Sequence, residues 1–99
     1  MIELNNEDFN ELIKEGTVLV DFYADWCGPC KMMNPIINQL AQEQPNLKII
    51  KVNVDFHDDL ARSYQVMSIP TIIIFKEGTE KERIIGFVSK DKLTELINK

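Results

Sequence analysis

The segment Trp26-Cys27-Gly28-Pro29-Cys30 lies between two stretches of opposite pattern and fixes how the chain must turn there. Residues 18–23 before it form a short apolar, β-rich run, which is typical of a buried strand. Residues 31–41 after it have the apolar spacing of a helix. The sequence therefore predicts that a strand ends and a helix begins at the two cysteines, which are the only ones in the chain.

This position favours thiolate chemistry at Cys27. The N-terminus of a helix has unpaired N–H groups and roughly half a positive charge, so it stabilises an anion. The thiolate is the reactive form of cysteine. Cys30 lies one helical turn further on, where it can reach Cys27 to form a disulfide but is shielded from outside partners. Gly28 lets another backbone approach closely, and Pro29 suits the first turn of a helix.

A purely structural role for the cysteine pair is the weaker interpretation. Closing a loop of about four residues stabilises a fold by only about 2 kcal/mol in the loop-entropy treatment, against about 3 kcal/mol for fifteen residues. We therefore expect a redox-active pair, with half of a metal site or two unreactive thiols as alternatives. A structural zinc ion needs four ligands, and beyond the cysteines only His57 is a candidate. We interpret His57 as a solvent-facing residue rather than a catalyst.

The length and charge of the chain limit the other function classes. Ninety-nine residues are expected to form one domain, residues 1–99. The net charge of −5 argues against a nucleic-acid or anionic-membrane partner. No apolar run approaches the roughly 20 residues that span a bilayer, and the first residues lack the pattern of a secretory signal. We expect a complete, cytoplasmic protein, in which a Cys-x-x-Cys pair indicates catalysis, redox sensing or metal binding.

The rest of the chain alternates between strand and helix patterns. Apolar alternation and turn residues predict strands at residues 2–4, 17–23, 47–55, 72–75 and 83–88. Apolar stripes predict a helix capped by Asn5 or Asn6 and ending near Glu15, and further helices at residues 27–43, 58–64 and after Ser89. Gly78 is expected to supply the positive φ of a hairpin turn between the last two strands.

Two charged residues interrupt the predicted strands. Alternation places Asp21 on the same face as Leu19 and Tyr23, where burial would raise the pKa of its carboxyl group. Asp21 is either a buried proton acceptor near the dithiol or a residue near the sheet end that meets water or a backbone N–H. Lys51 lies beside Asp21 if the second and third strands pair in parallel, and an ion pair would then offset part of the cost of burial. The alternative is a lysine at a sheet edge that extends its ammonium to solvent.

The order of the elements, with a Cys-x-x-Cys pair at the second strand-to-helix junction, resembles the thioredoxin family over essentially the whole chain. Trp-Cys-Gly-Pro-Cys is highly specific, and its combination with a distant Ile-Pro-Thr and an aspartate of the buried type strengthens the match. The residues that carry the resemblance are Val20 to Lys31, Pro35, Lys51 to Asp55, Ile69-Pro70-Thr71, Gly78 and Gly86.

The resemblance implies a fold and a division of roles. The fold would be α/β, the thioredoxin fold: a mixed five-stranded central sheet flanked by four helices, with the strands in the order first, third, second, fourth, fifth. Cys27 would be the attacking thiol and Cys30 the resolving one. Asp21, with Lys51 beside it, would relay a proton to or from Cys30. The Ile69–Pro70 peptide bond would be cis and would lie against the dithiol.

The resemblance also implies a substrate groove. The backbone of Ile69 would pair with the substrate chain as an added strand. Three departures from the family pattern are visible: Tyr23 replaces a frequent tryptophan, and Met67 and Phe87 replace smaller or more polar residues at the rim of the groove. The change at Tyr23 is mild, whereas those at Met67 and Phe87 would leave the chemistry intact and affect partner preference. The residues expected to line the groove are Trp26, Gly28, Pro29, Ile69, Pro70 and Gly86, with Met67 and Phe87 at the rim.

The sequence and the resemblance together predict a cytoplasmic, monomeric protein-disulfide reductase with no bound cofactor and no metal. Its partners would be disulfide-containing proteins and a thioredoxin reductase, a flavoprotein that supplies electrons from NADPH. A disulfide oxidase or isomerase is the alternative enzyme, which Gly28-Pro29 between the cysteines disfavours because such relatives usually carry histidine there. A non-catalytic interaction subunit of a larger assembly is the alternative from another class.

Overall fold

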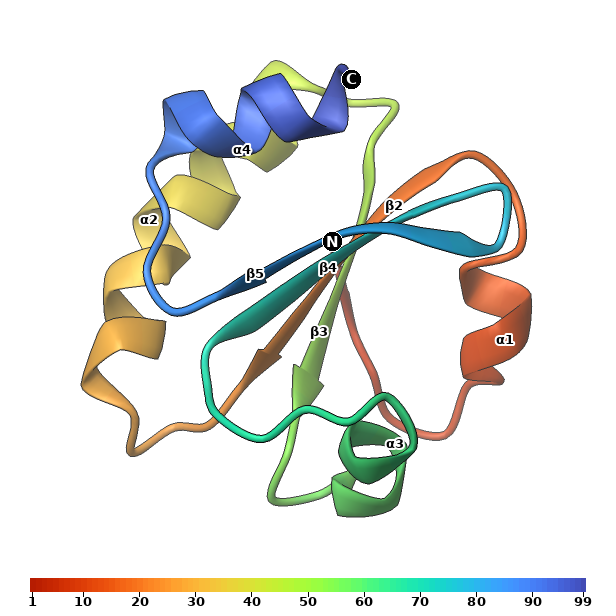
Figure 1. Ribbon diagram of the computed structural model, residues 1–99, viewed down its shortest axis with the longest axis vertical. Helices are drawn as coiled ribbons and strands as arrows, with labels where there is room; N and C mark the ends of the chain where they lie inside the picture. The colour runs from red at the N-terminus through yellow and green to blue at the C-terminus, as the bar shows by residue number, and fades with distance from the viewer.

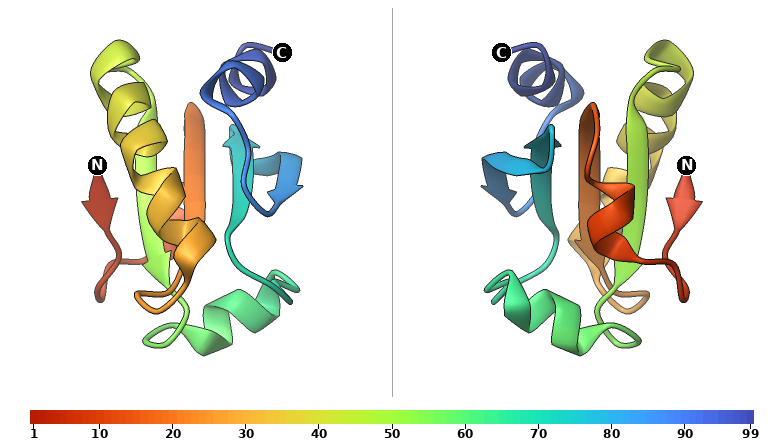
Figure 2. Two further views of the ribbon diagram at one scale, coloured as in Figure 1. Left: turned by 90° about the vertical axis from the view of Figure 1, so that its left-hand side faces the viewer. Right: turned by 90° about the vertical axis from the view of Figure 1, so that its right-hand side faces the viewer.

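The computed structural model describes residues 1–99, which form a central sheet with helices on both faces (Figure 1). Helices cover one face at α2 and α4 and the other at α1 and α3 (Figure 2). The elements in chain order are β1 (Ile2–Glu3), α1 (Phe9–Leu12), β2 (Thr17–Tyr23), α2 (Gly28–Glu43), β3 (Lys48–Asn53), α3 (Asp58–Ser63), β4 (Thr71–Lys76), β5 (Thr79–Ile85) and α4 (Lys90–Ile97).

The five strands lie in the order β1-β3-β2-β4-β5, which confirms the predicted mixed sheet. Strand β2 is central, pairing in parallel with β3 and antiparallel with β4. Strand β1 pairs in parallel with β3, and β5 returns antiparallel beside β4. Parallel strands need a crossover, and α2 provides it between β2 and β3. The cysteines therefore lie at the carboxyl end of the central strand, where α2 begins.

Two apolar layers, one on each face, hold the sheet in place. Side chains of β2 alternate between them: Val18, Val20 and Phe22 face α1 and α3, whereas Leu19 faces α2 and α4. On the α2 side, the layer is completed by buried residues of the apolar stripes of the two helices: Met33, Ile37 and Leu40 of α2, and Leu93, Leu96 and Ile97 of α4. Because residues 18–22 of β2 are buried, a polar side chain at one of these positions is taken out of water.

Helix α1 differs from its prediction at the start. Asp8, rather than Asn5 or Asn6, is the N-cap, and its side chain accepts hydrogen bonds from the backbone of Asn10 and Glu11. The helix also ends at Leu12 rather than near Glu15, so it has only four residues and is shorter than predicted at both ends. The residues before α1 are polar, and several of them are good N-caps. Capping by Asp8 places Phe9 at the first helical position, where its ring is buried in the core.

The predicted hairpin turn with Gly78 at positive φ is confirmed, but strand β5 begins earlier than predicted. Glu77 and Gly78 both have positive φ, at 51° and 82°, so a tight turn leads directly into β5 at Thr79 rather than at residue 83. Strand β5 ends at Ile85, before Gly86 (φ 92°), instead of running to residue 88. The predicted cap of the last helix is confirmed, because Ser89 accepts a hydrogen bond from the backbone N–H of Lys92.

Candidate active site

The two cysteines are joined as a disulfide at the start of α2, with their Cα atoms 5.2 Å apart. Cys27 is the N-cap of the helix, and its Sγ accepts a hydrogen bond from the backbone N–H of Cys30 at 3.2 Å. Pro29 occupies the first turn, where its missing N–H has no partner to lose. The predicted junction is thus confirmed, and the sulfur of Cys27 occupies the anion-favouring end of the helix.

Both cysteines lie just below the surface. Cys27 exposes 5% of its surface and Cys30 exposes 3%. They pack with Ala24 in a small cluster that Tyr23, Val54 and Ile69 border. The residues around them in the loop and first turn, Trp26, Gly28 and Pro29, are exposed. A partner that approaches Cys27 therefore meets an exposed rim before it reaches the sulfur.

The loop before β4 lies against the disulfide. The Ile69–Pro70 bond is cis, as the resemblance implies, and the Ile69 carbonyl oxygen is 3.8 Å from Cys27 Sγ. The backbone N–H of Gly86 donates to the Pro70 carbonyl at 2.8 Å, which joins the end of β5 to this loop. Cys27, Ile69, Pro70 and Gly86, distant in sequence, are brought together.

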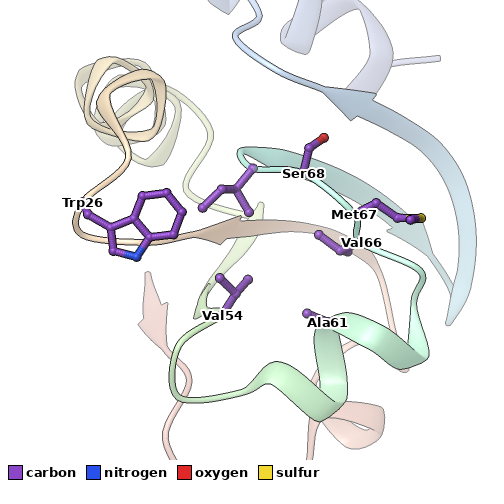
Figure 3. Close-up of a pocket in the computed structure, with 7 residues that line it drawn as sticks. Trp26, Val54, Ala61, Val66, Met67 and Ser68 are labelled. Atoms are coloured by element: carbon purple, nitrogen blue, oxygen red, sulfur yellow. The ribbon is translucent and has the colours of Figure 1, made fainter.

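A cavity of about 340 Å³ lies beside the disulfide, between α3 and the loop before β4 (Figure 3). Trp26 stands across it from Val66 and Ser68, and the side chain of Met67 points away from Trp26. The indole Nε1 of Trp26 donates to Asp55 Oδ2 at 3.0 Å, which fixes the ring at one side of the cavity. The lining residues are Trp26, Val54, Ala61, Val66, Met67, Ser68 and Ile69.

The cavity agrees with only part of the predicted groove. Trp26, Met67 and Ile69 line it. Sequence reasoning missed Val54, Ala61, Val66 and Ser68 as lining residues. Ala61 belongs to the predicted helix at residues 58–64, whose apolar stripe could have indicated that wall. The predicted groove residues that lie outside the cavity are Gly28 and Pro29, both exposed, Pro70, which is buried, Gly86, which is half-buried, and Phe87, which is 51% exposed.

Asp21 is buried in the layer between the sheet and α2. Its residue is 1% exposed, and neither carboxylate oxygen has a hydrogen-bond partner within the protein. Asp21 is therefore not at a solvent-facing end of the sheet, and no backbone N–H donates to its carboxylate. Burial raises the pKa of its carboxyl group from 3.8 to about 6; Lys51 opposes this effect and Glu3 adds to it.

Lys51 is the direct cross-strand partner of Asp21, as parallel pairing of the second and third strands predicted. The two side chains do not form the expected ion pair, however. The Nζ atom of Lys51 donates to Asn34 Oδ1 at 2.8 Å and lies 4.5 Å from the centroid of the Tyr23 ring. Because the ammonium has these other partners, it acts on Asp21 only from a distance.

His57 lies away from the disulfide and serves the fold. It is half-buried rather than solvent-facing, and its Nε2 is 2.9 Å from the Leu4 carbonyl oxygen. No group of three or more His, Cys, Asp or Glu side chains is arranged to hold a metal ion. No helix combines the length and the apolar character needed to cross a membrane.

Comparison with known proteins gives one family. The sequence profile described as Thioredoxin matches residues 1–99. The thioredoxin of Chlamydia pneumoniae is 49% identical over 96 residues, covering 97% of this chain and 94% of the relative. The thioredoxin of Bacillus subtilis is 44% identical over 100 aligned positions, covering 100% and 96%. The oxidised form of mitochondrial thioredoxin 3 from Saccharomyces cerevisiae superposes with a TM-score of 0.88 at 37% identity, covering 99% and 93%.

These matches agree with the geometry of the site. A disulfide at a helix N-terminus, flanked by a cis-proline loop and an apolar cavity, is suited to exchange with the disulfide of another protein. The cysteine pair is itself the redox centre, so the exchange needs no bound cofactor. The chain belongs to the thioredoxin family and is a thiol-disulfide oxidoreductase that reduces protein disulfides.

Proposed function

We propose that Cys27 attacks the substrate disulfide and that Cys30 resolves the resulting mixed disulfide. The observation that carries this assignment is the hydrogen bond from the Cys30 N–H to Cys27 Sγ at the start of α2. A negative charge on the Cys27 sulfur is stabilised by this donor and by the helix dipole. The sulfur of Cys30, inside the first turn, has no equivalent donor.

The exchange then takes two steps. The Cys27 thiolate attacks one sulfur of the substrate, so that a Cys27–substrate bond forms while the other substrate sulfur leaves with the electron pair and takes a proton from water. Cys30 next loses its proton and attacks the Cys27 sulfur. The Cys27–Cys30 bond forms, and the second substrate sulfur leaves as a thiolate. Two electrons have passed to the substrate.

We assign the proton from Cys30 to Asp21. This carboxylate lies on the face of β2 that α2 covers and has no other hydrogen-bond partner. Its pKa of about 6 lets it accept a proton during the second step and release it to water afterwards. Lys51 acts on this carboxylate through its charge.

The substrate chain is proposed to bind across the cis-proline loop and the cavity. The N–H of Ile69 takes part in no backbone hydrogen bond within the protein, so it is free to pair with an extended segment. Trp26 and Ile69 line the cavity, with Met67 at its rim, and would receive an apolar side chain. Gly28, Pro29, Pro70, Gly86 and Phe87 complete the proposed surface around Cys27.

The cycle is completed by a partner. We propose that a flavoprotein thioredoxin reductase returns electrons from NADPH to the Cys27–Cys30 disulfide, and that the protein works as a monomer in the cytoplasm. A dithiol that must be reduced again after each turnover needs a reducing compartment, which supports this location. The molar mass from light scattering tests the monomeric state. Oxidation of NADPH by a thioredoxin reductase in the presence of the oxidised protein tests the electron donor.

Trapping of mixed disulfides tests the division of roles. With Cys30→Ser, the protein is expected to accumulate covalently bound substrate that dithiothreitol releases. With Cys27→Ser, neither trapping nor reduction of insulin disulfides is expected. Equal trapping by both variants, or trapping only by Cys27→Ser, would contradict the assignment.

A further inference from the structure

A row of charged side chains crosses the sheet beneath α2. Cross-strand register places Glu3 of β1 beside Lys51 of β3, and Lys51 beside Asp21 of β2. The next strand, β4, contributes the apolar Ile72 opposite Asp21. The charged neighbours of Asp21 within the sheet are therefore Lys51 and, behind it, Glu3. From α2, Asn34 accepts a hydrogen bond from Lys51, and the cysteine pair lies in the cluster that Tyr23 borders.

The lysine in this row is held by groups other than Asp21. Its ammonium donates to the amide oxygen of Asn34 at 2.8 Å and lies 4.5 Å from the centre of the Tyr23 ring. The first contact is a hydrogen bond, and the second is a cation–π contact. Together they satisfy the charge of Lys51 without an ion pair to Asp21.

The ring beneath the ammonium is fixed in turn by Glu3. The Tyr23 hydroxyl donates to Glu3 Oε2 at 2.6 Å. Burial, followed by this hydrogen bond, raises the pKa of Tyr23, so the phenol remains a neutral donor. The ring also borders the cluster that contains the disulfide. Glu3 on the edge strand thereby sets the position of the aromatic face under Lys51.

The position of Lys51 matters because direct contact between its ammonium and the Asp21 carboxylate would lower the pKa of Asp21. An opposite charge within about 4–6 Å lowers the pKa of a carboxyl group by about 1–3. With Lys51 held by Asn34 and Tyr23, burial dominates and the pKa of Asp21 stays at about 6. The negative charge of Glu3 acts in the same direction as burial.

We propose that Asn34, Tyr23 and Glu3 are positioning residues that keep the Lys51 ammonium out of contact with Asp21, so that this carboxylate stays available for the proton of Cys30. The proposal rests on the proposed role of Asp21 in the second step. It adds that these three residues, which lie outside the Cys-x-x-Cys segment, set the proton affinity of the Asp21 carboxylate by positioning the Lys51 ammonium.

Titration of the Asp21 carboxyl group by NMR in the full oxidised chain tests the proposal. Asn34→Ala removes the acceptor of Lys51 and is expected to lower the pKa of Asp21 from about 6 by about one pH unit, as the ammonium moves toward the carboxylate. Asn38→Ala, the same change one turn further along the exposed side of α2, is the control and is expected to leave the titration unchanged. An unchanged or raised pKa in Asn34→Ala overturns the proposal.

The Lys51→Met background shows whether the effect passes through the lysine. In that background Asn34→Ala is expected to leave the Asp21 titration where Lys51→Met alone puts it. Tyr23→Leu, which removes the ring, is expected to behave like Asn34→Ala in both backgrounds. A lowered pKa that persists without Lys51 overturns the proposal, because the effect would then have another origin.

Kinetics separate this proposal from the proposed function. Resolution of the mixed disulfide at pH 7 is expected to slow several-fold in Asn34→Ala and not in Asn38→Ala, with the pH profile displaced in the same direction as the Asp21 titration. If Asp21→Asn leaves the resolution rate unchanged, the role of Asp21 as proton acceptor fails. The NMR titrations still decide whether Asn34 and Tyr23 control the placement of Lys51.

Discussion

Trp26 and Asp55 are joined by a hydrogen bond of 3.0 Å between the indole Nε1 and the carboxylate Oδ2, across 29 positions of sequence. This bond connects the loop before α2 to the loop after β3. Trp26 is 69% exposed, so the bond, rather than packing, holds the ring at the edge of the cavity. The orientation of the Trp26 ring at the proposed substrate surface therefore depends on the carboxylate of Asp55.

Asp55→Ala is expected to raise the KM for a protein disulfide several-fold with little change in kcat, because a mobile indole binds less well without altering the sulfur chemistry. The free energy of unfolding should fall by about 1 kcal/mol at most. Asp55→Asn keeps an oxygen acceptor and should retain most of the affinity. Insulin reduction gives KM and kcat, and fluorescence anisotropy reports on the only tryptophan. Identical KM values in the two variants would refute the role of this hydrogen bond.

Asp21 makes the stability of the protein depend on pH. The unfolded chain releases this proton near pH 3.8, whereas the native state holds it until about pH 6. The native state therefore binds the proton more tightly, and stability falls as pH rises from about 4 to about 6, then levels off. At pH 7 the loss is about 3 kcal/mol, since each unit of pKa difference is worth about 1.36 kcal/mol.

Asp21→Asn should remove this dependence and raise the stability at pH 7 by up to about 3 kcal/mol. Denaturant unfolding of both proteins at pH 4.5 and pH 7 measures it, with the exposed Asp91→Asn as the control for a carboxylate in water. A stability difference between Asp21→Asn and the unmodified chain that does not grow with pH would show that the native carboxyl group titrates normally.

Reduction of the disulfide is expected to weaken the fold modestly. Cys27 and Cys30 close a very short loop, so the cross-link restricts the unfolded chain little and contributes about 2 kcal/mol. Urea unfolding with and without dithiothreitol should show this difference. The unfolding midpoint of the Cys27→Ser/Cys30→Ser double variant should be the same with and without dithiothreitol. An unfolding midpoint that is the same for oxidised and reduced protein would disprove this contribution.

The parts of the site that follow from local sequence pattern were predictable. The strand before Cys27 and the helix after it came from apolar periodicity, and the placement of Cys27 as N-cap follows from that junction. The sheet order and the cis bond at Ile69–Pro70 came from the resemblance alone. An X-Pro bond is rarely cis, so no local signal selects that isomer.

The parts that depend on where long side chains settle were not predictable. Parallel pairing of β2 and β3 brought Lys51 beside Asp21 as expected, yet the ammonium lies on Asn34 and Tyr23. A lysine has several rotatable bonds, and strand register fixes only its Cα. The wall formed by Val66 was missed for a related reason, because it depends on the positive φ of Gln65, which turns the chain after α3.

Helix α1 should depend on Phe9 more than on its own hydrogen bonds. It has four residues, too few to be stable alone. The Phe9 ring packs edge-on against Tyr64 and Phe75, with centroids 5.5 and 6.1 Å away, and so joins α1 to the end of α3 and to β4. These contacts lie on the sheet face opposite the layer that holds Asp21.

Phe9→Ala is therefore expected to lower the free energy of unfolding by about 3–5 kcal/mol, the usual cost of removing a buried phenylalanine. Phe56→Ala is the matched control: its ring is 77% exposed, so the change should cost less than about 0.5 kcal/mol. Denaturant unfolding measures both. At temperatures where Phe9→Ala remains folded, mixed-disulfide resolution should keep its normal rate, because the lost contacts lie across the sheet from Cys30. Similar losses of stability in the two variants would contradict the role of Phe9 as the anchor of α1.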